Sequence, residues 1–181
     1  MIQIKAVVNP INFILFLLVV AVILIGCAGN ETQLIDGDQH ITLEMDEVIS
    51  NYIIQVYSSS NNDIEKQFEV HRIYGTSEVD GVLSVYMWSY YGGFNKSTGV
   101  ENQIGHSLPA VIRLKKEEEG SYSVIEYIEP QDGNLYLSSL QKMFPNKYLK
   151  LVKQDSGNIE DLKQKMDKKV EQWLEEKDHI S

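Results

Sequence analysis

The sequence predicts an α+β domain in which one helix precedes a four-stranded antiparallel β-meander and further helices follow it. Three observations support this class. Apolar residues recur at helical spacing over residues 41–57. Residues 67–130 have the composition of strands and are divided by turn signals such as Asp80-Gly81. Helical spacing then returns near the C-terminal end, over residues 158–177.

The chain begins with a segment of a different kind, Met1 to Cys27. Lys5 is its only charged residue, and an apolar run follows over residues 13–25. This run has the length of the apolar part of a signal peptide and is short for a membrane-spanning helix. Extending it to residues 11–28 gives about eighteen mostly apolar positions, so an uncleaved anchor is the alternative.

The end of this segment, Leu24-Ile25-Gly26-Cys27, resembles the lipobox of bacterial lipoproteins. The resemblance implies that the Cys27 thiol receives a diacylglycerol and that cleavage before it leaves Cys27 as the mature N-terminus. A thiolate is a strong nucleophile and suits such an alkylation. The alternative is a cysteine buried by chance in an apolar helix. Stable retention needs two or more acyl chains, which the lipoprotein modification supplies, palmitate among them.

Removal of the predicted signal peptide, residues 1–26, leaves 155 of the 181 residues. We expect a lipidated N-terminus and flexible tether over residues 27–40 and a single domain over residues 41–178. The whole chain carries a net charge of −10, which argues against nucleic acid and against docking on anionic lipid through a basic face. The composition, rich in Lys, Asn, Ile and Glu, is typical of low-GC Gram-positive bacteria.

The first helix is expected over residues 41–57, with Thr42 as its N-cap. Glu44, Asp46 and Glu47 fall in its first turn, where carboxylates stabilise the positive end of the helix dipole. A metal cluster is the alternative interpretation of these acids. It is disfavoured because no histidine or further acid stands at ligand spacing.

Four strands are expected over residues 68–75, 82–91, 108–116 and 122–129. A turn over residues 76–81 joins the first two, and a long loop over residues 92–107 joins the second to the third. The second strand is apolar or aromatic on both alternating faces, which predicts a central strand covered on both sides. Helices would cover one side, and either solvent or a partner would meet the other.

Three segments complete the domain. A short helix is expected over residues 135–144, ended by Pro145, and a short strand or extended segment over residues 148–152. The last helix, residues 158–177, carries a core-facing apolar stripe and a favourable Asp161–Lys165 pair at i,i+4. The stripe consists of Ile159, Leu162, Met166, Val170 and Trp173.

Catalytic signals are weak. His71 shares strand parity with Glu69, an arrangement that is usually a surface pair, and His106 lies in the long loop beside Ser107. A serine adjacent to a histidine in sequence is not a dyad, because nucleophile and base must meet in space. The chain contains no H-E-x-x-H, C-x-x-C or G-x-S-x-G motif. No cofactor or metal site is therefore predicted.

Aromatic residues gather on the second strand and its exit loop. Tyrosine and tryptophan recur at binding surfaces, since they combine a stacking face with a polar group. They are also strong strand formers that fill cross-strand pairs, so packing is the alternative. If a ligand site exists, we expect it where this strand meets the loop over residues 92–107. The candidate ligand-binding residues are Tyr86, Trp88, Tyr90, Tyr91 and Phe94.

Turn and strand motifs over residues 65–146 resemble uncharacterised lipoproteins of Bacillus-type bacteria. They are also similar to the extracytoplasmic domain of some membrane metalloproteases of the β-lactam-sensor type. The resemblance implies a sensing or interaction module and carries no catalytic residue across, because the protease's metal-binding segment is absent. The element order also resembles cystatin-like and nuclear-transport-factor-2-like folds. The motifs are Phe68 to Gly75, Val82 to Trp88, Gly105 to Pro109, Ile112 to Lys115, Tyr127 to Gly133 and Met143 to Pro145.

The resulting expectation is a lipid-anchored protein on the extracytoplasmic face of the cell membrane. It would act as a non-enzymatic binding or sensing module for a peptide, an envelope component or a membrane-protein partner. The alternative is an envelope hydrolase or accessory enzyme that uses His71 or His106 with a nearby acid.

Overall fold

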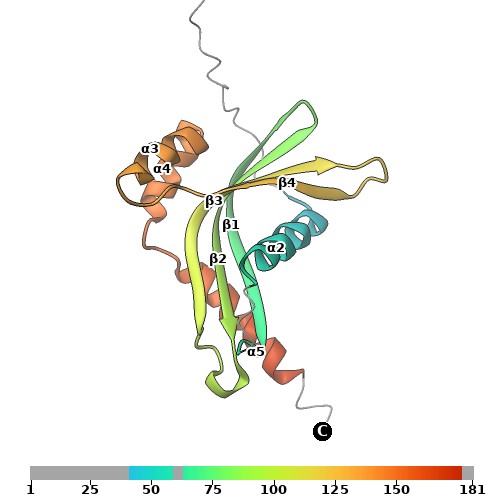
Figure 1. Cartoon of the computed structure of the whole chain (residues 1–181), viewed down its shortest axis with the longest axis vertical. Coiled ribbons are helices and arrows are strands. Elements are labelled where there is room, and N and C mark those ends of the chain that lie inside the picture. The colour runs from blue at the N-terminus through green and yellow to red at the C-terminus, as the bar shows by residue number, and fades with distance from the viewer. Residues whose placement is uncertain (1–40, 59–62, 177–181) are drawn as a thin grey trace, which may run out of the picture. The chain divides into compact units, whose positions relative to one another are not determined.

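A four-stranded antiparallel sheet in the order β1-β2-β3-β4 forms the centre of the domain (Figure 1). The computed structural model describes residues 41–58 and 63–176, so the predicted signal peptide, Cys27 and the tether lie outside the described residues. The strands are β1 (Lys66–Val79), β2 (Val82–Phe94), β3 (Ile104–Lys116) and β4 (Tyr122–Ile128). The predicted meander is confirmed.

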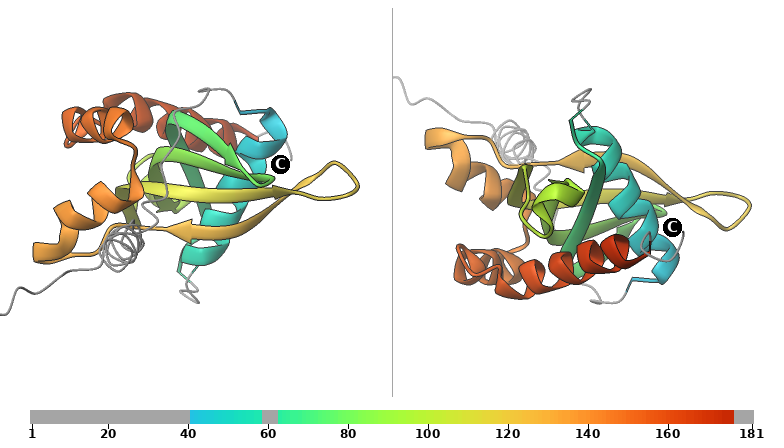
Figure 2. Two further views of the ribbon diagram at one scale, coloured as in Figure 1. Left: turned by 90° about the horizontal axis from the view of Figure 1, so that it is seen from above. Right: turned by 90° about the horizontal axis from the view of Figure 1, so that it is seen from below.

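The predicted helix before the sheet and helices after it are also confirmed (Figures 1 and 2). Helix α2 (Leu43–Tyr57) begins where the sequence indicates, since Thr42 Oγ1 accepts a hydrogen bond from the Met45 backbone N–H at 3.2 Å. The other helices are α3 (Tyr136–Met143), α4 (Asn146–Asp155) and α5 (Glu160–Glu175), with short 3₁₀ turns η1 (Lys96–Thr98) and η2 (Gly133–Leu135).

The first three strands run further than the sequence predicts. Strand β1 continues to Val79, so the hairpin turn shrinks to Asp80 and Gly81, both at positive φ (51° and 76°). The expected long loop shrinks to residues 95–103, because Gly92 and Gly93 still pair with Gly105 and Ile104. The sequence did not predict this longer pairing of β2 with β3, because glycine is a poor strand former.

Strand β2 separates two hydrophobic cores. Tyr86 and Trp88 face the core built with α3, α4 and α5, whereas Val85 and Met87 face the core built with α2. The prediction of a central strand covered on both sides is therefore confirmed. Helix α2 covers the face of the sheet that the sequence assigned to either solvent or a partner.

The predicted strand or extended segment over residues 148–152 is wrong, because these residues belong to helix α4. Tyr148, Leu149 and Val152 are its buried residues, at the i, i+1, i+4 spacing of one helix face. A short apolar run such as Tyr-Leu-Lys-Leu-Val, interrupted by a single lysine, fits a strand as well as a helix. Pro145, at the N-cap of α4, ends α3 and lets a second helix start in a new direction.

Helix α4 meets the sheet at a β-bulge. The register of β1 against β2 shifts between Ile73 and Gly75, and the end of the Tyr148 ring lies over Gly75. A Cβ atom on Gly75 would lie 2.2 Å from Cζ of Tyr148. The ring is fully buried and packs against Tyr86 at a centroid distance of 5.2 Å, so it has no room to retreat.

Gly75→Ala is therefore expected to lower the free energy of unfolding by about 1–3 kcal/mol, the cost of an overpacked core. Urea unfolding followed by circular dichroism measures it. Ser84→Ala, a change of similar size at a partly exposed position of β2, is the control and should be nearly neutral. Equal stability of Gly75→Ala and wild type would show that α4 does not press on the bulge.

Candidate functional site

A buried carboxylate lies between helix α2 and strand β1. Glu69 points from β1 toward α2 and is completely inaccessible to solvent. Its oxygens accept hydrogen bonds from Ser50 Oγ of α2 and Ser89 Oγ of β2, each at 2.8 Å, and contact Nδ1 of His71 at 3.1 Å. A buried charge of this kind persists only when it is paired and hydrogen-bonded.

His71 is the counter-charge of Glu69. Its Nε2 lies 3.1 Å from Oδ1 of Asp46, on α2, in an ion-pair contact that lacks the direction of a hydrogen bond. Burial alone lowers the pKa of His71, but the contacts with Asp46 and Glu69 outweigh it and raise the pKa to about 9. Both ring nitrogens face carboxylates, so the ring is an imidazolium at neutral pH. The expected surface pair of Glu69 and His71 is therefore wrong, since both residues are buried.

Asp46 has a second function besides the predicted one at the helix N-terminus. Contact with His71 lowers its pKa, against the opposing effect of partial burial, and the nearby Lys169 and Lys165 lower it further. Asp46 therefore joins the first turn of α2 to the middle of β1. Its half-exposed carboxylate also forms part of the surface there.

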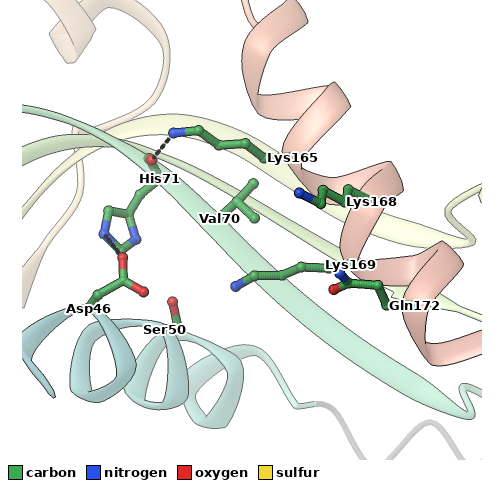
Figure 3. Close-up of a pocket in the computed structure, with 8 residues that line it drawn as sticks. All are labelled: Asp46, Ser50, Val70, His71, Lys165, Lys168, Lys169 and Gln172. Carbon is green, nitrogen blue, oxygen red and sulfur yellow. Dashed lines mark hydrogen bonds and ion pairs between the residues drawn. The ribbon is translucent and has the colours of Figure 1, made fainter. Parts of the chain in front are cut away.

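Helix α5 reaches this place from the opposite face of the sheet (Figure 3). The Lys165 ammonium donates to the His71 carbonyl at 3.3 Å, and the Lys169 ammonium donates to the Glu69 carbonyl at 2.9 Å. Strand β1 is an edge strand, so these lysines cover carbonyls that have no neighbouring strand. Within residues 63–176 and the described part of α2, no carboxylate lies at ion-pair distance from Lys165, Lys168 or Lys169.

Two adjoining cavities open beside these groups. One, of about 300 Å³, lies between α2 and α5 over His71. The second, of about 310 Å³, continues along the start of β1. They share Asp46, Ser50 and Lys169, and we call them together the α2–α5 cleft. The first is lined by Asp46, Ser50, Val70, His71, Lys165, Lys168, Lys169 and Gln172 (Figure 3).

The aromatic residues proposed from the sequence lie elsewhere, inside the fold. Tyr86, Trp88 and Phe94 belong to the core with α3–α5, and Tyr90 packs against it partly buried. Two of them also use their polar atoms within the fold: Trp88 Nε1 donates to Ser107 Oγ at 2.8 Å, and the Tyr86 hydroxyl is hydrogen-bonded to Ser77 Oγ at 3.1 Å. This burial favours the packing interpretation of the aromatic strand.

Tyr91 faces the other way and forms an aromatic group with His106 and Tyr57. The Tyr91 and His106 rings stack at a centroid distance of 5.2 Å, and Tyr57 lies 3.9 Å from His106. Burial lowers the pKa of His106, which favours the neutral ring. His106 lines neither cavity of the cleft.

The predicted Asp161–Lys165 pair is present only as an attraction without an ion-pair contact, and the main partner of Asp161 lies across the fold. Asp161 binds Arg72 of β1, which also contacts Asp155 at 2.7 Å and the Asn158 carbonyl at 3.1 Å. Arg72 thus holds the connection between α4 and α5 to the sheet. The Lys165 ammonium, whose charge still lowers the pKa of Asp161, donates to the β1 carbonyl in the cleft.

The sequence contained a partial signal for this site. Glu69 and His71 share one strand face, and Asp46 and Ser50 stand at i,i+4 on the first helix, beside the buried Met45 and Ile49. No local pattern indicates that the two pairs meet. The lysines were also missed, because charged residues on an amphipathic helix are usually solvated.

Comparisons with protein-family models, curated proteins and solved structures found no match. The resemblance to Bacillus-type lipoproteins and protease sensor domains therefore stays a prediction. Among the described residues there is no group of three or more His, Cys, Asp or Glu side chains placed to hold a metal ion. Nor does any helix in this part of the chain have the length and apolar character needed to cross a membrane.

The His71 network predicts a pH dependence of stability. Its pKa rises from 6.5 to about 9 on folding, so its contribution is fully present below pH 6.5 and is lost as pH rises through about 9. The contribution is on the order of 3 kcal/mol. Wild type should lose stability over this interval in urea unfolding, and His71→Gln should show much less dependence.

His106→Gln is the matched control for this measurement. The pKa of His106 is lowered on folding, so its own effect on stability is confined to pH values below about 6.5. The loss of stability at alkaline pH should therefore remain in His106→Gln. An identical alkaline profile in wild type and His71→Gln would contradict the assignment of a buried imidazolium.

Proposed function

We propose that this protein is an extracytoplasmic lipoprotein, held on the cell membrane by lipid on Cys27, whose folded domain is a non-enzymatic binding module. The anchor is supported by the apolar segment and the lipobox-like Leu24-Ile25-Gly26-Cys27. The polar residues 28–39 that follow suit a tether between lipid and domain. The domain's ligand site is the α2–α5 cleft.

The observation that supports binding rather than proton transfer is the state of His71. A general base needs a free lone pair, but both nitrogens of His71 face carboxylates and carry protons. The hydroxyls of Ser50 and Ser89 both donate to Glu69. Both hydroxyls are therefore directed at the buried Glu69 carboxylate and not at a histidine, the base on which the hydrolase alternative depends. His106, the other histidine of the hydrolase alternative, is packed between tyrosine rings.

The cleft has the character of a recognition site. Its fixed charges lie on three segments distant in sequence, and Lys165 and Lys169 are held at defined positions by the β1 carbonyls. A ligand would meet charges whose positions are largely set before binding, which lowers the entropic cost of association. The partner class is an envelope peptide, a small molecule of the envelope or a membrane protein.

Cys27→Ser should release the protein from the membrane, because the serine hydroxyl does not replace the thiol in lipid transfer. Fractionation of cells and incorporation of labelled palmitate measure the loss. Ala28→Ser, a change of similar size at the next position, is the control and should stay membrane-bound. A Cys27→Ser protein that is still cleaved and still in the membrane fraction would refute the lipid anchor.

The binding site is tested by photo-crosslinking in cells. A benzoylphenylalanine residue replacing Gln172, which lines the cleft, should yield a covalent adduct detectable by mass spectrometry. The same residue at Gln164, exposed on α5 and outside both cavities, is the matched control and should yield none. Equal adducts at both positions, or none at Gln172, would count against the cleft as the site.

A further inference from the structure

The α2–α5 cleft is a positively charged region on the surface of an acidic protein. The chain carries 26 acidic against 16 basic residues. Lys165, Lys168 and Lys169 nevertheless lie together at the first cavity without a carboxylate at ion-pair distance among the described residues. Asp46 is the one acid that lines this cavity, and Lys165 and Lys169 already lower its pKa, so a single carboxylate faces three ammonium groups and a further anion would be attracted there.

The charge can be counted from the groups at this cavity. Three lysines and the His71 imidazolium supply four positive charges, and Asp46 and Glu69 supply two negative ones. Two positive charges remain. Glu69 is completely buried, its oxygens bind His71, Ser50 and Ser89, and it does not line this cavity.

The lysines also retain donors for a ligand. An ammonium group has three N–H donors, and the β1 carbonyls use one each on Lys165 and Lys169. No hydrogen bond from Lys168 occurs within the described chain, although Lys168 lines the same cavity. Several ammonium N–H groups can therefore meet an oxyanion without loss of the contacts that hold the lysines in place.

We propose that this cavity binds the phosphate group of a phosphate monoester, with Lys165, Lys168 and Lys169 as its cationic partners. The proposal rests on the proposed function of the domain as a binding module. A phosphate monoester carries close to two negative charges at neutral pH, which matches the two uncompensated positive charges.

The residue types favour phosphate over carboxylate. Arginine recognises carboxylate and phosphate alike through its planar guanidinium, whereas lysine acts as a compact point charge. Several lysines together supply the charge that a doubly charged phosphate needs and a singly charged carboxylate does not. The nearby arginine, Arg72, is already bound by Asp155 and Asp161 and does not line the cavity. The three lysines instead line the α5 side of a space of about 300 Å³, enough for a phosphate with a small organic group.

The same cavity suggests what the organic group carries. Asp46 and Gln172 offer acceptor oxygens beside the lysines, and the Val70 side chain offers a short apolar surface. A hydroxyl group near the phosphate could donate to Asp46. Glycerol phosphate, free or as the headgroup of a lipid, has this combination of groups and serves as the probe.

The test is calorimetric titration of the full chain in maltoside micelles, which contain no phosphate. Glycerol 3-phosphate, short-chain phosphatidic acid and acetate are compared at equal ionic strength. Glycerol 3-phosphate should bind, and more weakly as sodium chloride is raised. Lys168→Gln, which removes a cation that makes no hydrogen bond to any described residue, should weaken binding by roughly fivefold.

Lys163→Gln is the matched control, since Lys163 is exposed on α5 but lines neither cavity. It should leave the affinity unchanged. Binding of phosphatidic acid alone, with the same Lys168 dependence, would also support the phosphate site and assign its source to the membrane. Absence of phosphate binding, or equal effects of Lys163→Gln and Lys168→Gln, would overturn it.

Acetate binding that depends on Lys168, without phosphate binding, would overturn the phosphate assignment and leave the proposed binding function standing. The crosslinking at Gln172 does not depend on the ligand's chemistry. A failed phosphate titration with a positive Gln172 adduct therefore refutes only this inference.

Discussion

The buried Glu69 carboxylate is the constraint on which the arrangement of helices around β1 depends. A carboxylate removed from water costs several kcal/mol unless it is compensated. Its compensation comes from three elements: His71 of β1, Ser89 of β2 and Ser50 of α2. Helix α2 must therefore lie in one position along the sheet, because a shift by one turn would remove Ser50 from Glu69 and Asp46 from His71. Apolar packing alone tolerates such shifts more readily.

The two hydrophobic cores explain why the charges gather at the edge of the sheet. Helix α2 covers one face and α3–α5 cover the other, so β1 is the strand over which the two helical layers approach each other. Polar groups of α2 and α5 extend past its edge, and the edge carbonyls receive the Lys165 and Lys169 ammonium groups. The contacts that protect the exposed edge of the sheet are the same contacts that form the charged cleft.

Periodicity predicts most of the fold because it is a local property. The Thr42 cap, the meander and the central position of β2 all follow from residues close in sequence. Helix α4 was missed because an apolar run of five residues is too short to distinguish a helix from a strand. The cleft was missed for a different reason. His71 lies 25 positions from Asp46 and 94 from Lys165, and only the packed structure brings them together.

The lysines of α5 connect the stability of the domain with its proposed binding. Lys165 and Lys169 are held by β1, so their positive charges stay at the cleft whether or not a ligand is present. The cost of gathering these charges is paid on folding, by the β1 carbonyls and by the nearby Asp46. An oxyanion that enters the cleft therefore relieves repulsion that already exists, and the protein needs no rearrangement to receive it. Such a site is expected to bind without a large change in backbone structure.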